Sequence, residues 1–339
     1  MGVTAEQSAV LTFSNSGITE TSAGSGYTID GTTLTITTAG TYRISGSCSE
    51  GAVIVGKGLS SVTLVLDNLT LASSTTAPIV VKKSATANIH LVGTSTLTDN
   101  EDPANETSTD TTIAEAFEGA AIKVKSGSTV TFCGDGDLNV VANAKNGIKG
   151  GATASLIFNQ SGTINVSGNA KVYGATTAGA AVNNGIACDG SLIFNQGTYV
   201  IKAANDGIKS APDATDETAG TVIDTESAGT VTINGGTFNL NTGDDAVHSD
   251  ANATVTGGTF TISTGDDGMH ADTSLTIGTE NGYERDPDIT INKSYEGLEG
   301  GTVYIYSGRQ YVVASDDGVN AAGGSSNGSD PGAGGGNTF

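Results

Sequence analysis

The chain has 339 residues, and its 36 Asp and Glu outnumber its 14 Lys and Arg to give a formal net charge of −22. This balance argues against nucleic acid, whose phosphates need a basic patch, and against anionic membranes. No apolar run approaches the ~20 residues that cross a membrane as a helix, so we expect no membrane insertion. With 49 Gly, 5 Pro and no Trp, the composition favours short strands joined by tight turns.

The first 45 residues differ from the rest of the chain. Their apolar residues alternate with polar ones, as Leu34, Ile36, Tyr42 and Ile44 illustrate. A solenoid needs an atypical terminal unit over its open end, so we predict that residues 1–45 form an N-terminal β cap. The start Met1-Gly2 resembles a chain whose export signal has been removed. We therefore expect an extracellular or cell-surface protein.

We predict that residues 46–322 form one repetitive β domain, because a short motif recurs seven times between residues 146 and 319. In this motif a polar residue is followed by Gly or Ala and then by an aliphatic residue. Successive copies are separated by 38, 22, 39, 22, 29 and 21 residues. A recurring spacing of this size is typical of stacked repeats. The copies are Asn146-Gly147-Ile148, Asn184-Gly185-Ile186, Asp206-Gly207-Ile208, Asp245-Ala246-Val247, Asp267-Gly268-Met269, Glu296-Gly297-Leu298 and Asp317-Gly318-Val319.

Each unit contains three strand-like pieces, as 229–234, 237–241 and 245–250 show. Successive units resemble each other, so like strands should pair in parallel, with coils ~4.8 Å apart. The fold class is therefore all-β, a parallel β-helix with coils of about 22 residues. We expect one inward row of residues per strand: Val231, Ile233, Phe238, Leu240 and Val247, then Val255, Phe260, Ile262 and Met269. Asn159, Asn195 and Asn234 should form a ladder of stacked side chains.

Three insertions interrupt the coils, at 99–118, 168–183 and 211–228. Long loops on a rigid scaffold often carry binding residues, but these can equally be solvated decoration. The last segment, 323–339, is Gly-rich and is typical of a flexible tail.

Two copies of the motif carry a double acid, Asp244-Asp245 and Asp266-Asp267, one repeat apart. Stacked coils would bring these carboxylates together, and oxygen ligands are those that Ca²⁺ prefers. We therefore predict a calcium site here. The alternative is that the acids are solvated at turn positions, where Asp is common. Further acids fall in line with this site or on a second ladder, and these are Asp206, Glu296, Asp316 and Asp317, with Asp250 and Asp272 at the far end of the strand.

Histidine and tyrosine offer two further candidate sites. His248 and His270 are 22 residues apart and should stack, which allows a transition-metal site or, alternatively, exposed partners of the Asp ladder. Tyr304 and Tyr306 flank Ile305, and Tyr311 follows on the next strand. If Ile305 faces inward, Tyr304 and Tyr306 face outward and form, with Tyr311, a stripe that could stack on sugar rings. The alternative is that these are ordinary half-buried surface tyrosines.

Several segments together resemble a family of secreted clostridial carbohydrate-binding proteins. They are GTYRISG, APIVVKKS, NGIKG, NDGIKS, GDDAVHSD, GDDGMHAD, SYEGLEG and ASDDGVNAAGG, in this order along the chain. The resemblance implies a right-handed parallel β-helix, similar to that of the family 9 polysaccharide lyases, which act on pectic polysaccharide with calcium. It also implies bound calcium and binding of cellulose or acidic sugars.

Three functions follow as hypotheses. The first is a non-catalytic, calcium-containing module that binds plant cell-wall polysaccharide, either acidic pectic sugars or cellulose. The second is a calcium-dependent pectate-type lyase, for which the resemblance suggests a lysine base. Lys209 is our first candidate for that base, with Lys149 and Lys202 behind it, although we expect no compact cluster of Lys and Arg. The third is a structural surface protein that self-associates through the open ends of its coils.

Overall fold

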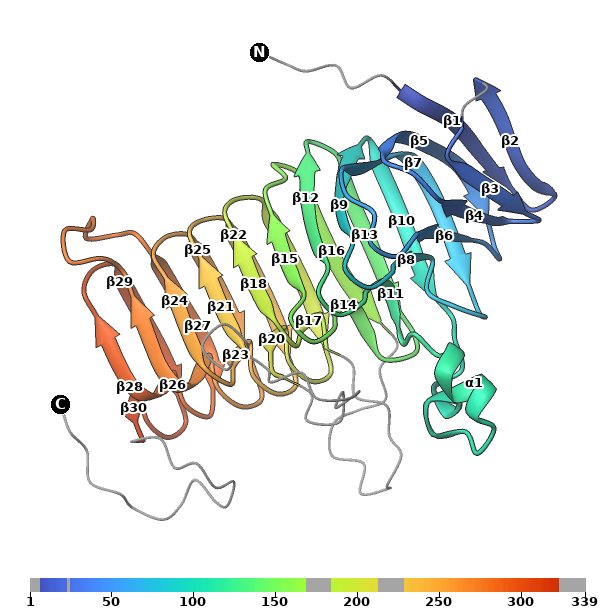
Figure 1. The fold of residues 1–339 in the computed structure, drawn as a ribbon. Helices are drawn as coiled ribbons and strands as arrows, with labels where there is room; N and C mark the ends of the chain where they lie inside the picture. Colours follow the sequence, from blue (N-terminus) through green and yellow to red (C-terminus); the bar gives the residue numbers. More distant parts are fainter. Residues whose placement is uncertain (1–6, 23–24, 169–183, 213–228, 323–339) are drawn as a thin grey trace.

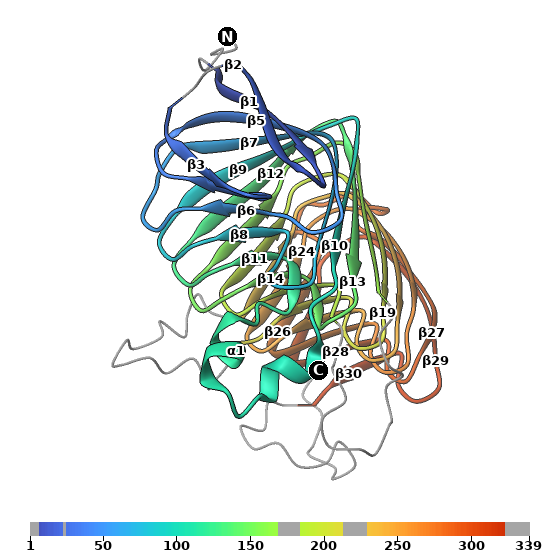
Figure 2. The same cartoon turned by 90° about the vertical axis from the view of Figure 1, so that its right-hand side faces the viewer.

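The computed structural model describes residues 7–22, 25–168, 184–212 and 229–322. These residues form an all-β, mostly parallel arrangement of 30 strands. The described helices are the 3-10 helix η1 (Pro103–Thr107) and the α-helix α1 (Thr111–Ala116), which project from the side of the stack (Figures 1 and 2). No helix of the described part is long and apolar enough to cross a membrane.

The N-terminal strands carry the antiparallel pairings of the described chain. Strand β1 (Gln7–Ser14) pairs with β2 (Gly17–Ser22), and β3 (Tyr27–Asp30) pairs with β4 (Thr33–Ile36). Strands β1 and β4 also begin the parallel stack, since β1 pairs with β5 (Gly40–Cys48) and β4 with β6 (Ala52–Val55). All the antiparallel pairs thus fall within the segment predicted as a cap.

The remaining strands form three parallel ladders, in which each strand usually pairs with the third strand after it. The motif ladder, named for the repeated motif, continues from β6 through β8 (Ile79–Val81), β11 (Ala120–Val124), β14 (Asn146–Gly150), β17 (Ile186–Cys188), β20 (Ile208–Ser210), β23 (Val247–Ser249), the first half of β26 (Met269–Ile277), the first half of β28 (Leu298–Ile305) and β30 (Val319–Ala321).

The second ladder continues from β5 through β7 (Val62–Ser73), β9 (Thr86–Val92), β12 (Thr129–Gly134), β15 (Ser155–Phe158), β18 (Ser191–Phe194), β21 (Thr230–Ile233), β24 (Asn252–Val255) and the second halves of β26 and β28. The third ladder runs from the end of β7 through β10 (Thr94–Asp99), β13 (Asp137–Ala142), β16 (Thr163–Gly168), β19 (Thr198–Ala203), β22 (Thr237–Thr242), β25 (Thr259–Ser263), β27 (Asp288–Ser294) and β29 (Arg309–Ala314).

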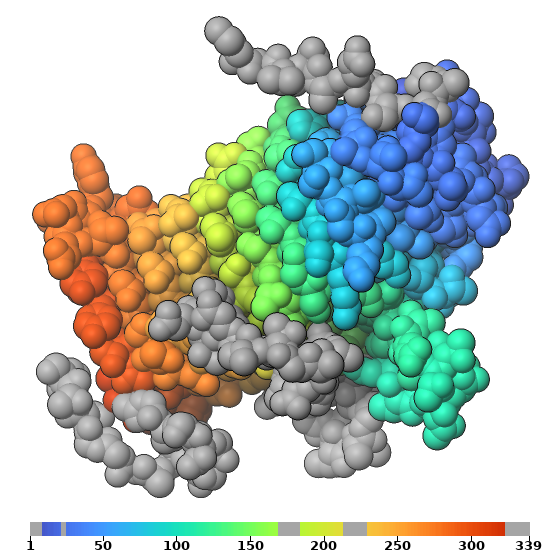
Figure 3. All heavy atoms as spheres, in the orientation of Figure 1, coloured from blue at the N-terminus to red at the C-terminus, as the bar shows by residue number. Residues whose placement is uncertain are grey.

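The register confirms that like residues pair with like. Phe238 lies opposite Phe260, and Val247 lies opposite Met269. Because each coil pairs only with its neighbours, the chain advances steadily along the long axis of the molecule (Figure 3).

The core is a column of stacked apolar residues between the ladders. All nine inward positions predicted from the sequence are at most 1% exposed. Aromatic rings form two stacks within this column, Phe132–Phe158–Phe194 with centroids 4.7 and 4.6 Å apart, and Tyr199–Phe238–Phe260 with centroids 4.7 and 4.6 Å apart. The edges of the first stack meet the second, since the rings of Phe194 and Tyr199 lie 5.1 Å apart at 88°.

The predicted asparagine ladder is also present. The side-chain amide of Asn195 donates to the Asn159 oxygen at 2.7 Å, and Asn234 donates to Asn195 at 2.7 Å. Of the three insertions, 99–118 contains η1 and α1. Residues 169–183 and 213–228 of the other two, and the tail 323–339, lie outside the described residues.

Replacing Phe194 by Ala should remove the ring that joins the two aromatic stacks. We expect the free energy of unfolding to fall by about 3–5 kcal/mol, because a large buried side chain is lost and a cavity remains. Chemical denaturation followed by circular dichroism measures this change. Asn239→Ala, on the exposed face of β22, is the control and should change stability by less than about 0.5 kcal/mol. Equal effects of the two substitutions would contradict a stacked core.

Candidate functional site

In three successive copies of the motif, those of Asp206, Asp245 and Asp267, the polar residue is tied into the fold through one oxygen of its side chain. This oxygen accepts a hydrogen bond from the backbone N–H of the equivalent residue one coil further. Asp245 donates to Asp206 Oδ1 at 3.2 Å, Asp267 to Asp245 Oδ1 at 2.9 Å, and Glu296 to Asp267 Oδ1 at 3.2 Å. Asp206 is fully buried, and Asp245, Asp267 and Glu296 are nearly so. Part of the acidic repeat therefore satisfies buried backbone groups.

The second oxygen of Asp206, Asp245 and Asp267 meets a basic side chain three residues later. The motif aspartate lies in the turn before the strand, and the basic residue faces outward from the motif ladder. The pairs are Asp206–Lys209 (Oδ2–Nζ 2.7 Å), Asp245–His248 (Oδ2–Nδ1 2.6 Å) and Asp267–His270 (Oδ2–Nδ1 3.3 Å). Lys209 and His248 occupy equivalent positions on neighbouring strands. Burial opposes the charge of Lys209, but Asp206 outweighs it and raises the pKa of the ammonium group.

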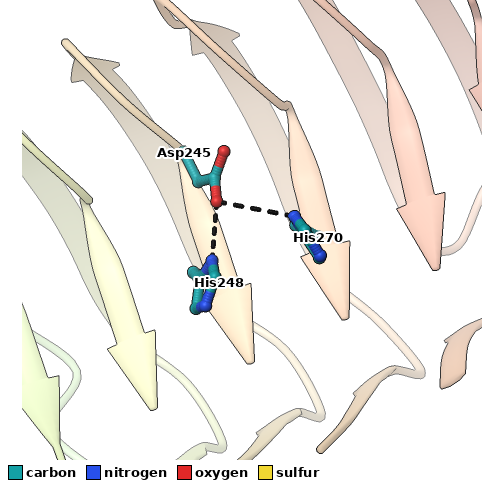
Figure 4. Close-up of side chains that lie close together, drawn as sticks. All are labelled: Asp245, His248 and His270. Carbon is teal, nitrogen blue, oxygen red and sulfur yellow. Dashed lines mark hydrogen bonds and ion pairs between the residues drawn. The ribbon is translucent and has the colours of Figure 1, made fainter. Parts of the chain in front are cut away.

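The two histidines lie side by side on neighbouring coils, with ring centroids 5.0 Å apart. Figure 4 shows their rings beside Asp245. On the far side of each ring, Nε2 contacts an aspartate, Asp250 at 2.9 Å from His248 and Asp272 at 3.1 Å from His270. Burial opposes protonation of His248, but its hydrogen bonds to Asp245 and Asp250 outweigh it and raise the pKa to about 9.

Three of the acids predicted to bind calcium converge at the turn before these strands. Carboxylate oxygens of Asp244, Asp245 and Asp266 all lie within 4.8 Å of one another. Burial, followed by the charges of Asp206, Asp245 and Asp266, raises the pKa of Asp244 to about 7. The mutual repulsion of these carboxylates is the electrostatic environment that a bound cation would relieve.

The fourth predicted acid, Asp267, faces a different group. Its Oδ2 lies by His270, and Glu299 from the next coil joins them within 4.8 Å. Burial, together with the neighbouring carboxylate of Asp267, raises the pKa of Glu299 to about 8. Asp267 therefore groups with His270 and Glu299 and lies outside the group of Asp244, Asp245 and Asp266.

The remaining predicted acids lie one and two coils further on. Asn320 donates to both carboxylate oxygens of Glu296, at 2.9 and 2.8 Å. The exposed Asp316 hydrogen-bonds Tyr295, and the carbonyl of Asp317 accepts from the Gly297 N–H at 2.9 Å. These acids extend the row toward the C-terminal coil without joining the cluster around Asp244.

Basic residues gather on the motif ladder beside the acids. Lys123 lies opposite Lys149, Lys149 opposite Ala187, and Ala187 opposite Lys209. A pocket of about 730 Å³ opens over these strands, and α1 forms part of its wall. Six of the chain's 14 Lys and Arg line this lysine pocket: Lys83, Lys123, Lys125, Lys145, Lys149 and Lys209.

Our expectation that the chain has no compact Lys and Arg cluster is therefore wrong. The lysines are distant in sequence, and only the coil register brings them together. One signal was available, since Lys149 and Lys209 both follow the motif's polar residue by three positions. Lys123 holds the same place after Ala120, which pairs with Asn146. Of the weaker candidates, Lys149 lies in the pocket, whereas Lys202 is exposed on the third ladder.

The charges of the lysine pocket are only partly neutralised. Lys149 pairs with Asp189, Lys125 with Glu118, Lys145 with Glu106, and Lys209 with Asp206. Lys123 has no ion pair with a carboxylate of the described chain. Burial, followed by the charges of Lys125 and Lys149, lowers its pKa to about 8. A half-buried ammonium group without a partner is suited to receive an anion.

The predicted tyrosine stripe lies at the C-terminal end of the stack. The rings of Tyr304 and Tyr306 are nearly parallel, with 2° between their planes and 6.1 Å between centroids. Both are about half exposed, and so is Tyr311. Tyr304 projects from the second ladder and Tyr311 from the third.

Comparison with known proteins places this chain in a family. A family model described as carbohydrate-binding domain-containing protein matches residues 30–329. The chain belongs to this carbohydrate-binding family. No curated protein matches it. Among solved structures, it is similar to the polysaccharide lyase-like protein from C. thermocellum, in a gadolinium derivative, with a TM-score of 0.60 and 25% identity over 79% of this chain and 95% of that one. The family and this clostridial neighbour confirm the resemblance found in the sequence.

Proposed function

We propose that this protein is a non-catalytic module that binds acidic plant cell-wall polysaccharide, outside the cell or on its surface, and carries calcium. The stack would be the right-handed parallel β-helix that the resemblance implies. The observation that carries the proposal is the lysine pocket beside the acid cluster. Membership of the carbohydrate-binding family and the polysaccharide lyase-like neighbour support a polysaccharide ligand.

The lysine pocket offers a local route to an acidic sugar despite the net charge of −22. At physiological ionic strength, exposed charges are screened beyond ~8 Å, so the pocket's own lysines determine the potential that a bound carboxylate experiences. Lys123 supplies a charge without an ion-pair partner in the described chain, and Lys149 lies beside it one coil further. A uronate carboxylate would accept charge-assisted hydrogen bonds from these two ammonium groups.

The acid cluster would hold calcium through Asp244, Asp245 and Asp266. Their donors are all oxygens, they lie within 4.8 Å of one another, and the raised pKa of Asp244 reports a deficit of positive charge there. These features fit the ligands that Ca²⁺ prefers. Bound calcium would supply a hard cation that neutralises this cluster and can also bridge to a carboxylate of the polysaccharide.

Lys123→Met and Lys149→Met should each weaken binding of polygalacturonate about tenfold, since a hydrogen bond to a charged group contributes ~1.5 kcal/mol. Binding by the wild type should fall as the pH rises through 8, because Lys123 then loses its charge, and Lys123→Met should abolish this pH dependence. Isothermal titration calorimetry with galacturonate oligomers measures both effects. Lys202→Met, on the exposed face of the third ladder, is the matched control and should bind as the wild type does.

Neutral cellulose provides a second control. Cellulose binding should be unchanged by the lysine substitutions and should weaken when Tyr304 and Tyr306 are both replaced by Ala. Unchanged polygalacturonate binding in Lys123→Met and Lys149→Met would refute the pocket as the site. If EDTA removed all polygalacturonate binding while both lysine variants bound normally, the polysaccharide would instead be held by a calcium bridge at the acid cluster.

Calcium should raise the melting temperature of the wild type, because a ligand that binds only the folded state stabilises it. Asp244→Asn and Asp266→Asn should lose this increase.

In EDTA, the effect of Asp244→Asn on the melting temperature should change sign, from destabilising to neutral or stabilising. The raised pKa of Asp244 means that its charged form destabilises the fold above its ordinary pKa, so Asp244→Asn should melt at or above the wild-type temperature at pH 8. Asp30→Asn, on the exposed face of β3, should behave as the wild type. Equal melting curves in calcium and EDTA would disprove the calcium site.

A lyase remains the second candidate, because one lysine has the properties of a base. Lys123 has a pKa near 8 and no ion pair in the described chain, whereas our sequence candidate Lys209 is held charged by Asp206. A general base works best with a pKa near the working pH. We expect no unsaturated uronate to form when the protein, with calcium, is given polygalacturonate and absorbance is followed. Product that is lost in Lys123→Met and kept in Lys209→Met would instead establish the lyase.

A further inference from the structure

We propose that His248, His270 and Asp245 form a site for a divalent transition-metal ion of the zinc class, which shares Asp245 with the calcium cluster but differs from it in its nitrogen donors. The three side chains come from two neighbouring coils of the motif ladder. Their ligand atoms, Nδ1 of each ring and a carboxylate oxygen, lie within 4.8 Å of one another. Both Nδ1 atoms face Asp245 Oδ2, at 2.6 Å from His248 and 3.8 Å from His270 (Figure 4).

The far nitrogen of each ring is already fixed by a second carboxylate. Nε2 of His248 lies 2.9 Å from Asp250, and Nε2 of His270 lies 3.1 Å from Asp272. Histidine ligands of metals commonly donate the other ring N–H to a carboxylate, which fixes the tautomer and the direction of the ring. Here that arrangement occurs twice, in register, and it leaves both Nδ1 atoms on the same side. A merely surface-exposed histidine pair would not require two such supports.

The spacing of the potential ligands fits a small ion. Two atoms bonded to zinc at ~2.0–2.1 Å with a tetrahedral angle lie ~3.3 Å apart. Around Nδ1 of His270, the oxygens of Asp267, Glu299 and Asp245 lie at 3.3, 3.5 and 3.8 Å. Asp267 and Glu299 thus lie beside the His270 ligand atom, but they form a separate group with His270 and are not among the three proposed ligands. The His248–Asp245 contact of 2.6 Å is shorter, and it would open by ~0.7 Å around the ion.

Donor type and charge favour a transition metal over calcium at these atoms. Imidazole nitrogen suits zinc, nickel, copper and iron, whereas calcium takes oxygen ligands. Five carboxylates surround the two rings, which are those of Asp245, Asp250, Asp267, Asp272 and Glu299. Two imidazolium protons and one divalent ion carry the same charge, so exchanging one for the other leaves the net charge of the cluster unchanged. The alternative role of the rings is that of protonated bridges between carboxylates, which would bind no metal.

Titration of the full chain, freed of metal with a chelator, tests the site. Zn²⁺ should bind one equivalent by calorimetry, and Co²⁺ at the same site should show the visible absorption of a nitrogen-ligated ion. Millimolar Ca²⁺ should not displace the cobalt. His248→Gln and His270→Gln should each abolish the cobalt spectrum. Asp250→Asn, which keeps all three ligands and removes only the support of one ring, should weaken binding about 10- to 100-fold.

Two controls separate a lost site from a lost fold. His90→Gln replaces the third histidine of the chain, on β9, and should bind cobalt as the wild type does. Circular dichroism of each variant reports whether the stack has formed. Absence of zinc binding by the folded wild type would overturn the proposal in favour of protonated bridges. A cobalt spectrum that survives in the two histidine variants, or is lost in His90→Gln, would place the metal elsewhere. Neither result bears on polygalacturonate binding by the lysine pocket.

Discussion

In-register pairing of each coil with the next is the constraint on which the whole structure depends. Neighbouring strands of a sheet lie ~4.8 Å apart, so every residue has its counterpart at this distance on both sides. Apolar residues gain from this arrangement, as the stacked rings of Phe132, Phe158 and Phe194 show. Asparagine gains as well, because its amide can donate to one neighbour and accept from the other. Charged residues do not, since like charges at this distance repel.

In the motif ladder, this repulsion is offset by opposite charges on the neighbouring row. Each row of like charges runs beside a row of opposite charge, so that Asp206, Asp245 and Asp267 meet Lys209, His248 and His270 three residues later. Along the outward row itself, the charge changes sign from Lys209 through the histidines to Glu299, and the row then ends at the neutral Asn320. Lysines thus occupy the outward row on β11, β14 and β20, histidines on β23 and β26, and glutamate on β28. The acid cluster lies in the turns before the two histidine strands, next to this change of charge.

The sequence predicted the features that follow from the period alone. A repeat of 21 or 22 residues places Phe238 against Phe260 and His248 against His270, and both pairings are observed. It also brings Asp244, Asp245 and Asp266 together. The lysine pocket was missed because coils separated by insertions have no fixed spacing. Lys123 to Lys149 is 26 residues and Lys149 to Lys209 is 60, so the shared register appears only when strands are aligned.

The neighbours of a side chain were the second thing that the sequence could not fix. Asp245 and Asp267 are equivalent by period, and each directs Oδ2 toward the histidine three residues later. Asp245 also faces His270 of the following coil, whereas Asp267 faces Glu299, because the outward row changes there from histidine to glutamate. The identity of the residue one coil further thus determines what a motif aspartate can bind. Where the outward row carries lysine, as at Lys209, the motif aspartate forms an ion pair with it. Where histidine occupies this place, Nδ1 can exchange its proton for a metal. Asp245 then lies between the two proposed sites, with the nitrogen ligands along the strand and the oxygen ligands in the turn before it.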